Sequence, residues 1–107
     1  MRTAALHEKA FNALGDPTRR SIFEKLAKGP LSVVHIAEGL PISRPAVSQH
    51  LTILRDAGLV TERRRGNFRL YRTRPEALSE VRAYIEAFWT DHLPRLKAAA
   101  EKEAKQR

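Results

Sequence analysis

Apolar residues recur at helical spacing in the first third of the chain, and glycine and proline separate the repeats. The first repeat consists of Leu6, Ala10, Ala13 and Leu14. It predicts a helix over residues 3–14 that ends at Gly15. Asp16 and Pro17 then supply the N-cap and the first position of a second helix, which the pair Gly29-Pro30 ends. Proline at the start and glycine at the end are typical of helix boundaries.

Two short helices follow, joined by a tight link. Ser32 is a suitable N-cap for a short third helix. Ser43 caps a fourth helix over residues 43–57, since Pro45 fits its first turn and Gly58 suits the position after its end. Two short helices in this arrangement predict a helix-turn-helix.

A β-hairpin comes next. Residues 59–65 and 68–73 are strand-like, and Gly66-Asn67 between them suits a two-residue I′ or II′ turn. With this loop, Arg64 lies directly across from Arg69. Like charges placed opposite one another destabilise a hairpin, and a phosphate backbone between the guanidinium groups removes that repulsion. The hairpin therefore indicates a nucleic-acid partner, with a solvated basic surface as the alternative.

One face of the fourth helix is free to contact a partner. At 100° per residue, Val47, Leu51 and Leu54 form a core stripe. Small polar residues and Gln49 project to the opposite side, where glutamine can bond adenine and serine or threonine can reach bases or phosphates. His50 projects nearer the core, which favours a packing or orienting role over a base contact. The alternative is an ordinary exposed helix face. The residues expected at the nucleic-acid interface are Ser43, Arg44, Pro45, Ser48, Gln49, His50, Thr52, Arg55, Arg63, Arg64, Arg65, Asn67 and Arg69.

The end of the chain carries a second apolar repeat, formed by Leu78, Val81, Ile85, Phe88, His92 and Leu96. This face is wider than one small domain needs, so we expect a long helix whose apolar side is covered by a second copy of the chain. Packing on the chain's own first helix is the alternative. Pro94 predicts a kink or a stop near residues 90–93. The residues expected at the dimer interface are Leu6, Phe11, Leu78, Val81, Ile85, Phe88 and Trp89.

Charge and composition narrow the function further. The 107 residues carry a net charge of +8, and residues 44–74 hold eight arginines against two acidic residues, so six of the eight net charges lie there. The absence of cysteine excludes disulfides, thiolate metal sites and a thiol nucleophile. An apolar leader and a membrane-spanning run are both missing from the sequence, which favours a single cytoplasmic domain.

Two stretches resemble the ArsR family of winged helix-turn-helix transcriptional repressors: LGDPTRRSIFEKL (Leu14 to Leu26) and SRPAVSQHLTILRDAGLVTERRRGNFRLY (Ser43 to Tyr71). The resemblance implies a mainly α fold of about five helices with a small two-stranded hairpin, the wing. It implies one winged helix-turn-helix domain over residues 1–107, with a recognition helix at 43–57 and a wing at 59–74. It also implies a homodimer, formed through residues 3–14 and 76–97, that binds operator DNA and releases it when an effector binds.

The metal-binding patterns of this family are not recognisable here. Residues 32–38, where metal-sensing members often carry a cysteine pair, contain no thiol, and Asp91 and His92 are adjacent in sequence rather than at ligand spacing. A metal site could then form only if Asp91 and His92 converged with His7 and Glu8 of a partner subunit. We therefore expect no metal and no cofactor, and the effector stays unidentified. The place to look for one is between the first and last helices, near Phe11, Tyr84, Phe88 and Trp89, although an aromatic cluster there also fits plain dimer core.

Other function classes fit less well. The sequence has no phosphate-binding glycine loop, no nucleophile elbow and no paired carboxylates, so an enzyme is not expected. A basic RNA-binding or nonspecific architectural protein is the main alternative, but the hairpin offers only Phe68 and Tyr71 for base stacking. A protein-interaction module would leave Arg64 opposite Arg69 unexplained. The sequence thus predicts a homodimeric repressor that reads an inverted repeat in double-stranded DNA.

Overall fold

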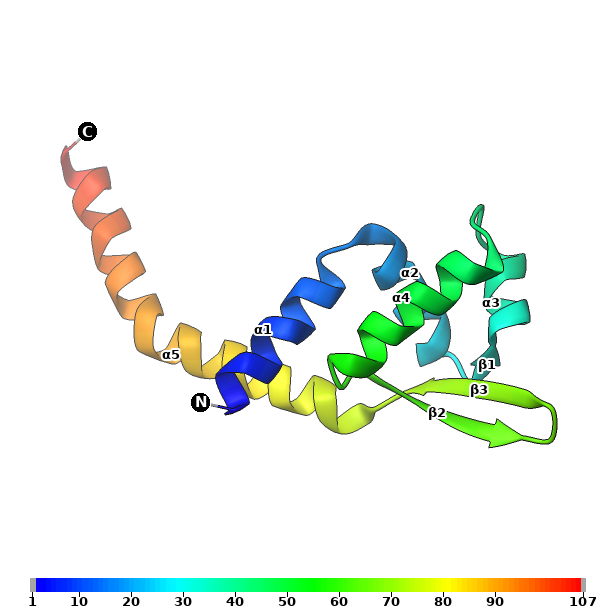
Figure 1. The fold of residues 1–107 in the computed structure, drawn as a ribbon. Helices are drawn as coiled ribbons and strands as arrows, with labels where there is room; N and C mark the ends of the chain where they lie inside the picture. The colour runs from blue at the N-terminus through cyan, green and yellow to red at the C-terminus, as the bar shows by residue number, and fades with distance from the viewer. Residues whose placement is uncertain (1, 107) are drawn as a thin grey trace.

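The computed structural model describes residues 2–106, with side chains described from residue 8 onward. The helices are α1 (Arg2–Leu14), α2 (Pro17–Ala27), α3 (Val33–Glu38), α4 (Arg44–Asp56) and α5 (Pro75–Gln106). The strands are β1 (Leu31–Ser32), β2 (Val60–Arg65) and β3 (Phe68–Thr73). Helices α2, α3 and α4 lie above the hairpin, and α5 runs beneath α1 and then projects away from the rest of the molecule (Figure 1). The expected mainly α fold with a small β-sheet is confirmed.

Side-chain caps set where the helices begin. The carboxylate of Asp16 accepts a hydrogen bond from the Arg19 N–H at 2.9 Å, and the Ser43 hydroxyl accepts one from the Ala46 N–H at 3.3 Å. Each cap satisfies a backbone donor that has no partner within the helix. Gly58, with φ of 76°, takes the left-handed conformation just after α4. The predicted boundaries of α2 and α4 are confirmed.

The sheet has three antiparallel strands in the order β1-β3-β2, where the sequence predicted two. The additional strand β1 pairs Leu31 with Tyr71 and Ser32 with Leu70. A strand of two residues is too short to produce an alternating pattern, so it forms only because the link between α2 and α3 passes along β3. At the hairpin tip Gly66 has a φ of 61°, and no non-glycine residue in the described chain has a positive φ. The turn is therefore of the II′ kind, with glycine at its first central position.

The core lies between α2, α3, α4 and the base of the sheet. Its fully buried large side chains are Ile22, Leu26, Ile36, Val47, Leu51, Leu54, Leu59 and Val60. Full burial of a side chain of this size contributes about 1.5–3 kcal/mol. Three of these residues form the predicted stripe of α4, so this helix is fixed on one side and presents its other side to solvent.

Helix α5 continues through Pro94 to Gln106, beyond the segment 76–97 that we expected at the dimer interface. Of the two alternatives that Pro94 predicted, the helix shows the kink and not the stop, because it changes direction between its yellow and orange parts (Figure 1). Proline removes one backbone hydrogen bond and its ring presses on the carbonyl of Thr90, four residues earlier, which bends a helix without ending it. Over residues 2–106, none of the helices combines the length and the apolar character needed to cross a membrane.

Candidate nucleic-acid interface

The exposed side of α4 carries the predicted reading residues. Arg44, Pro45, Ser48, Gln49, Thr52 and Arg55 are all exposed. Two hydroxyls are partly used within the helix, since the Thr52 hydroxyl donates to the Ser48 carbonyl at 3.0 Å and Ser43 serves as the N-cap. Their oxygens still have a free lone pair for a donor on a partner. Gln49 and Arg44 are exposed and form no side-chain hydrogen bond among the described residues, so their polar ends face solvent.

Ile53 belongs to the same exposed surface and was missed by the sequence reasoning. Its exposed fraction is 42%, and it follows Gln49 by one helical turn. The helical projection that identified Gln49 would also have found it, had apolar residues outside the core stripe been considered. An exposed aliphatic side chain beside a polar one suits the methyl group of thymine.

His50 lies at the edge of the core, as the projection indicated. His50 is half-buried as a whole. Its Nδ1 atom is fully buried and has no hydrogen-bond partner in the described part of the chain. The hydrogen bond from the backbone N–H of Arg19 lowers the pKa of the Asp16 carboxyl, and the charge of the Arg19 guanidinium lowers it further. The buried Nδ1 atom of His50 places this ring against the core rather than on the outward face of α4.

The strand register confirms that Arg64 lies directly across from Arg69. Residues 61–69 are all exposed, so both guanidinium groups are in solvent. Because strand side chains alternate between faces, this pair shares one face with Tyr71, whereas Arg63 and Arg65 lie on the other. The wing therefore carries positive charge on both faces, with Asn67 at its tip.

At the base of the same face, burial raises the pKa of the Tyr71 hydroxyl, and the neighbouring Glu62 carboxylate raises it further. The Tyr71 hydroxyl thus stays protonated at the edge of the core, beneath Arg64 and Arg69.

Arg55 stands apart from the other predicted contacts. Its guanidinium lies 3.2 Å from the Glu62 carboxylate on β2 and 3.8 Å from Asp56. This ion pair connects the end of the reading helix to the wing. Because the Arg55 side chain is 42% exposed, the pair contributes at most about 1 kcal/mol, and a phosphate could compete for the arginine.

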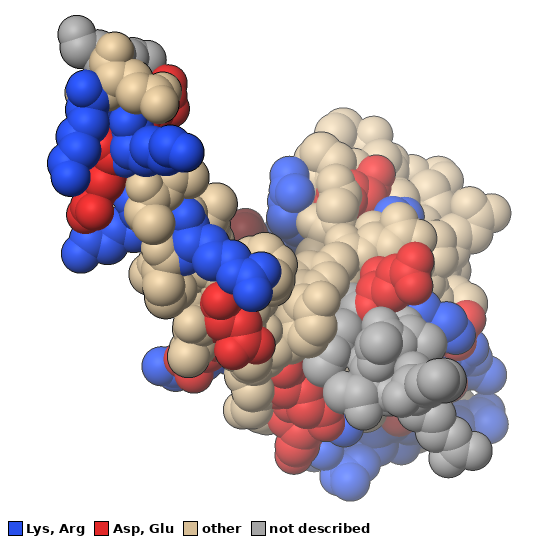
Figure 2. Space-filling model, turned by 90° about the vertical axis from the view of Figure 1, so that its left-hand side faces the viewer, with Lys and Arg blue, Asp and Glu red and all other residues tan. Residues whose placement is uncertain are grey.

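Basic side chains are unevenly distributed over the surface. In Figure 2 they gather along the lower edge of the domain, whereas basic and acidic side chains are mixed along the projecting helix α5. This distribution agrees with the excess of arginine within residues 44–74. A polyanion that lies along α4 and the wing would meet mostly positive charge, so its binding should depend strongly on salt.

A large apolar surface is left uncovered on α1 and α5. Among the described side chains it consists of Phe11, Leu78, Tyr84, Ile85, Phe88, Trp89, Leu93 and Leu96, each between 39% and 52% exposed. Phe11 of α1 does pack on Tyr84 of α5, with ring centroids 5.7 Å apart. Packing on the chain's own first helix thus occurs, but it leaves most of the face in solvent. The side chain of Leu6, also predicted at this surface, lies outside the described residues.

The arrangement of His7 and Glu8 with Asp91 and His92 of a partner subunit stays a hypothesis, since it spans two copies of the chain. Within the described residues no group of three or more histidine, cysteine, aspartate or glutamate side chains could hold a metal ion. The ring of His92 packs against Phe88, with centroids 4.5 Å apart. The side chain of His7 lies outside the described residues.

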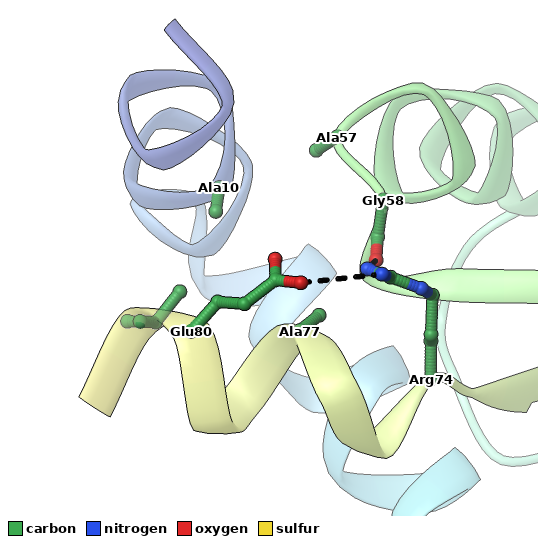
Figure 3. Close-up of a pocket in the computed structure, with 7 residues that line it drawn as sticks. Ala10, Ala57, Gly58, Arg74, Ala77 and Glu80 are labelled. Atoms are coloured by element: carbon green, nitrogen blue, oxygen red, sulfur yellow. Dashed lines mark hydrogen bonds and ion pairs between the residues drawn. The ribbon is translucent and has the colours of Figure 1, made fainter. Parts of the chain in front are cut away.

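A cavity lies between α1 and α5, but nearer the wing than the aromatic cluster where we expected it. Its volume is about 260 Å³, and its walls include Ala10, Ala57, Ala77 and Glu80 (Figure 3). Small side chains on three helices leave this space open. Its lining residue Val81 lies about one turn of α5 before Tyr84.

Comparison with known proteins agrees with this architecture. Residues 16–62 match the model of the family described as bacterial regulatory protein, arsR family. The chain is 48% identical over 90 residues to the HTH-type transcriptional regulator Rv2034 of Mycobacterium tuberculosis. This match covers 84% of each protein. It is 43% identical over 61 residues to the transcriptional repressor SdpR of Bacillus subtilis, covering 57% of this chain and 68% of SdpR.

Among solved structures, the chain is similar to the homodimeric winged helix-turn-helix DNA-binding domain of Mb0332 from Mycobacterium bovis. That protein is a possible ArsR-family transcriptional regulator, studied as the fragment 1–100. The TM-score is 0.67 at 28% sequence identity, and the match covers 84% of this chain and 83% of the other.

Proposed function

The chain belongs to the arsR family of bacterial regulatory proteins and is a DNA-binding transcriptional regulator, and we propose that it represses transcription as a homodimer on an inverted-repeat operator. The family consists of transcriptional regulators, which are not enzymes. The observation that carries the proposal is the combination of two surfaces. A helix that is buried on one side presents a polar face, and beside it a hairpin holds two arginines directly opposite each other.

The geometry of α4 supports a base-reading role. Its buried stripe fixes the helix in place, so its exposed side chains are pre-positioned. Gln49 has the donor and acceptor needed for a bidentate contact to adenine, and Arg44 at the start of the helix suits guanine or a phosphate. Ser48 and Thr52 flank Gln49 and would complete a surface that fits the major groove. We assign these contacts as the source of sequence specificity.

The wing supplies affinity rather than specificity in this proposal. The repulsion between Arg64 and Arg69 is relieved when phosphate oxygens lie between them. Arg63 and Arg65 on the other face, with Asn67 at the tip, would contact the flanking backbone or the minor groove. Such contacts bind all DNA sequences alike.

The uncovered apolar face of α1 and α5 supports the dimer. An aromatic side chain presents about 150–250 Å², so the aromatic residues Phe11, Tyr84, Phe88 and Trp89, each 40–46% exposed, alone leave roughly 240–460 Å² of apolar area, and the exposed leucine and isoleucine side chains add to it. A stable protein interface buries about 800 Å² on each partner. A second copy of the chain is the simplest cover, because a two-fold axis places the same face of both copies together.

Two-fold symmetry then sets the form of the operator. The two α4 helices would enter successive major grooves, about 34–36 Å apart along the duplex. The operator should therefore be an inverted repeat with half-sites centred about one helical turn apart. Because its ligand is chromosomal DNA, we place the protein's action in the cytoplasm.

RNA binding is the weaker alternative on structural grounds. Readers of single-stranded RNA stack bases on aromatic side chains of an exposed sheet. In the described hairpin Phe68 is 62% exposed, but Tyr71 is only 8% exposed and lies in the core. One exposed ring on the wing offers no stacking platform, which favours duplex DNA.

The direct test is selection of bound sequences from a random duplex library with the full chain. We expect enrichment of one sequence that reads the same on both strands about a two-fold axis. Enrichment of an asymmetric sequence would contradict the homodimeric arrangement, and a library that stays random would contradict sequence-specific binding.

A further inference from the structure

The cavity between α1, α4 and α5 lies where the three functional parts of the molecule meet. Ala10 contributes from α1, Ala57 and Gly58 from the end of the reading helix, and Ala77 from the start of α5 (Figure 3). The cavity therefore touches both the element that reads DNA and the helices that form the proposed dimer. A molecule bound here would contact all of them at once.

The walls of the cavity are mostly apolar, and its charged lining residues are Arg74 and Glu80. Its volume of about 260 Å³ is below the common range for drug-sized ligands, which is about 300–1,000 Å³. It therefore suits a ligand of fragment size, with a compact apolar body and a single charged group.

Arg74 is the more firmly held of the two charged residues. Its guanidinium donates to the Gly58 carbonyl at 3.1 Å, and its backbone N–H donates to the Leu59 carbonyl at 2.9 Å. Glu80 reaches Arg74 at 3.4 Å from the adjoining turn of α5, and its side chain is 50% exposed. An ion pair this exposed holds its partners weakly. The carboxylate of Glu80 is thus a replaceable counter-ion on a fixed cation.

We propose that this cavity is an effector site for a small organic monocarboxylate. The apolar body of the ligand packs between Ala10, Ala57 and Ala77, and its carboxylate takes the place of Glu80 at Arg74. A cationic ligand fits less well, because it would have to pair with the half-exposed Glu80 while lying against the guanidinium of Arg74. The regulatory consequence of this site rests on the function proposed above.

Binding at this site would act on DNA recognition through the base of the wing. Arg74 directly follows β3, and Gly58 directly follows the C-cap of α4. A ligand that displaces Glu80 moves the start of α5 relative to these two residues. Because α5 also carries the proposed dimer face, the separation of the two reading helices changes. The ligand then lowers the affinity for the operator, and the operator lowers the affinity for the ligand by the same factor.

The first test is a titration of the full chain with sodium benzoate, in which proton–nitrogen correlation NMR measures the binding. We expect saturable shifts of the Gly58 and Ala77 amides at millimolar benzoate, as is usual for a ligand of this size. Benzamide has the same ring without the charge and should bind at least tenfold more weakly. Equal affinity for benzoate and benzamide, or no saturable shift near these residues, would overturn the proposal.

Variants distinguish a Glu80 that competes with the ligand for Arg74 from a Glu80 that only stabilises the fold. Glu80→Gln removes the competing carboxylate and should tighten benzoate binding several-fold, whereas Arg74→Gln should abolish it. Ala77→Leu, which fills the cavity and leaves both charges in place, should also abolish binding, so the proposal does not depend on the folding of the Arg74 variant. Glu86→Gln is the matched control, because Glu86 forms a similar pair with Arg82 at 2.9 Å further along α5. If Glu80→Gln and Glu86→Gln behave alike, the site is wrong.

The second test measures operator affinity with and without benzoate. We expect benzoate to weaken operator binding by about 5- to 150-fold, the usual range of allosteric coupling, and Ala77→Leu to remove the effect. Benzoate binding without any change in operator affinity would overturn the effector role. Loss of specific DNA binding already in the absence of benzoate would instead count against the proposed function, so the two failures are distinguishable.

Discussion

Replacement of Ile85 by aspartate should break the proposed dimer without unfolding the domain. Ile85 is 39% exposed and lies outside the buried core cluster, on the apolar face of α5. A second copy of the chain would cover its exposed part. Ile85→Asp places a charge at the same position in both subunits, because a two-fold axis repeats it.

The size of the effect follows from the exposed fraction. Full burial of an isoleucine side chain contributes about 1.5–3 kcal/mol, so covering the exposed 39% contributes roughly 0.6–1.2 kcal/mol per subunit. An unpaired carboxylate in the interface costs several kcal/mol more for each copy. The total for two subunits exceeds about 4 kcal/mol, which corresponds to about a 1,000-fold rise in the dimer dissociation constant.

Sedimentation velocity over a concentration series measures this constant directly. Ala83→Asp is the matched control, since Ala83 is exposed and lies on the opposite side of α5. Ile85→Asp should sediment as a monomer and bind an inverted repeat much more weakly, while Ala83→Asp should remain a dimer. An unchanged dimer for Ile85→Asp, or equal dissociation of both variants, would refute this use of the apolar face.

Three further predictions concern the reading helix, the wing and the cap of α2. Gln49→Ala should lower affinity for the operator by about 1–3 kcal/mol and affinity for random DNA far less; equal losses in gel-shift titrations on both DNAs would remove Gln49 from base reading. Arg64→Thr should weaken binding to operator and random DNA alike and reduce the salt dependence, yet raise the thermal stability of the free protein, because it removes the like-charge pair with Arg69; a variant that melts earlier than the wild type would contradict the repulsion argument. The lowered pKa of Asp16 means that its contribution to stability is present above the ordinary carboxyl pKa and is lost as the pH falls through the lowered value. Asp16→Asn should therefore lose less stability than the wild type on acidification in this range, as measured by urea unfolding at several pH values, and parallel curves would show that the cap carries no such charge effect.

The elements that local chemistry determines were predictable from the sequence. Caps at Asp16, Ser32 and Ser43 begin helices, and the buried stripe of α4 follows from the positions of its apolar residues. The two-residue turn fixes the hairpin register, which places Arg64 opposite Arg69 without any tertiary information. The sequence therefore predicted which residues lie on the exposed face of α4 and on the wing, but not how these two elements are arranged in space.

Features that depend on the approach of distant segments were not predictable. Strand β1 forms because residues 31–32 pass along β3, and two residues carry no periodicity. The cavity exists because Ala10, Ala57 and Ala77 from three helices come together, which no local pattern records. At Pro94 the sequence left a kink and a stop as alternatives, since the residues on either side favour a helix strongly enough to continue through the proline.

The central claim is that this chain reads a specific sequence in duplex DNA. The most direct measurement is the dissociation constant for the selected operator, for a scrambled duplex and for an RNA duplex of the operator sequence, each over a salt series. We predict that the operator is bound about 1,000-fold or more tightly than the other two at physiological salt. Equal binding of all three with a steep salt dependence would show that the arginines supply only nonspecific charge, and it would contradict the claim.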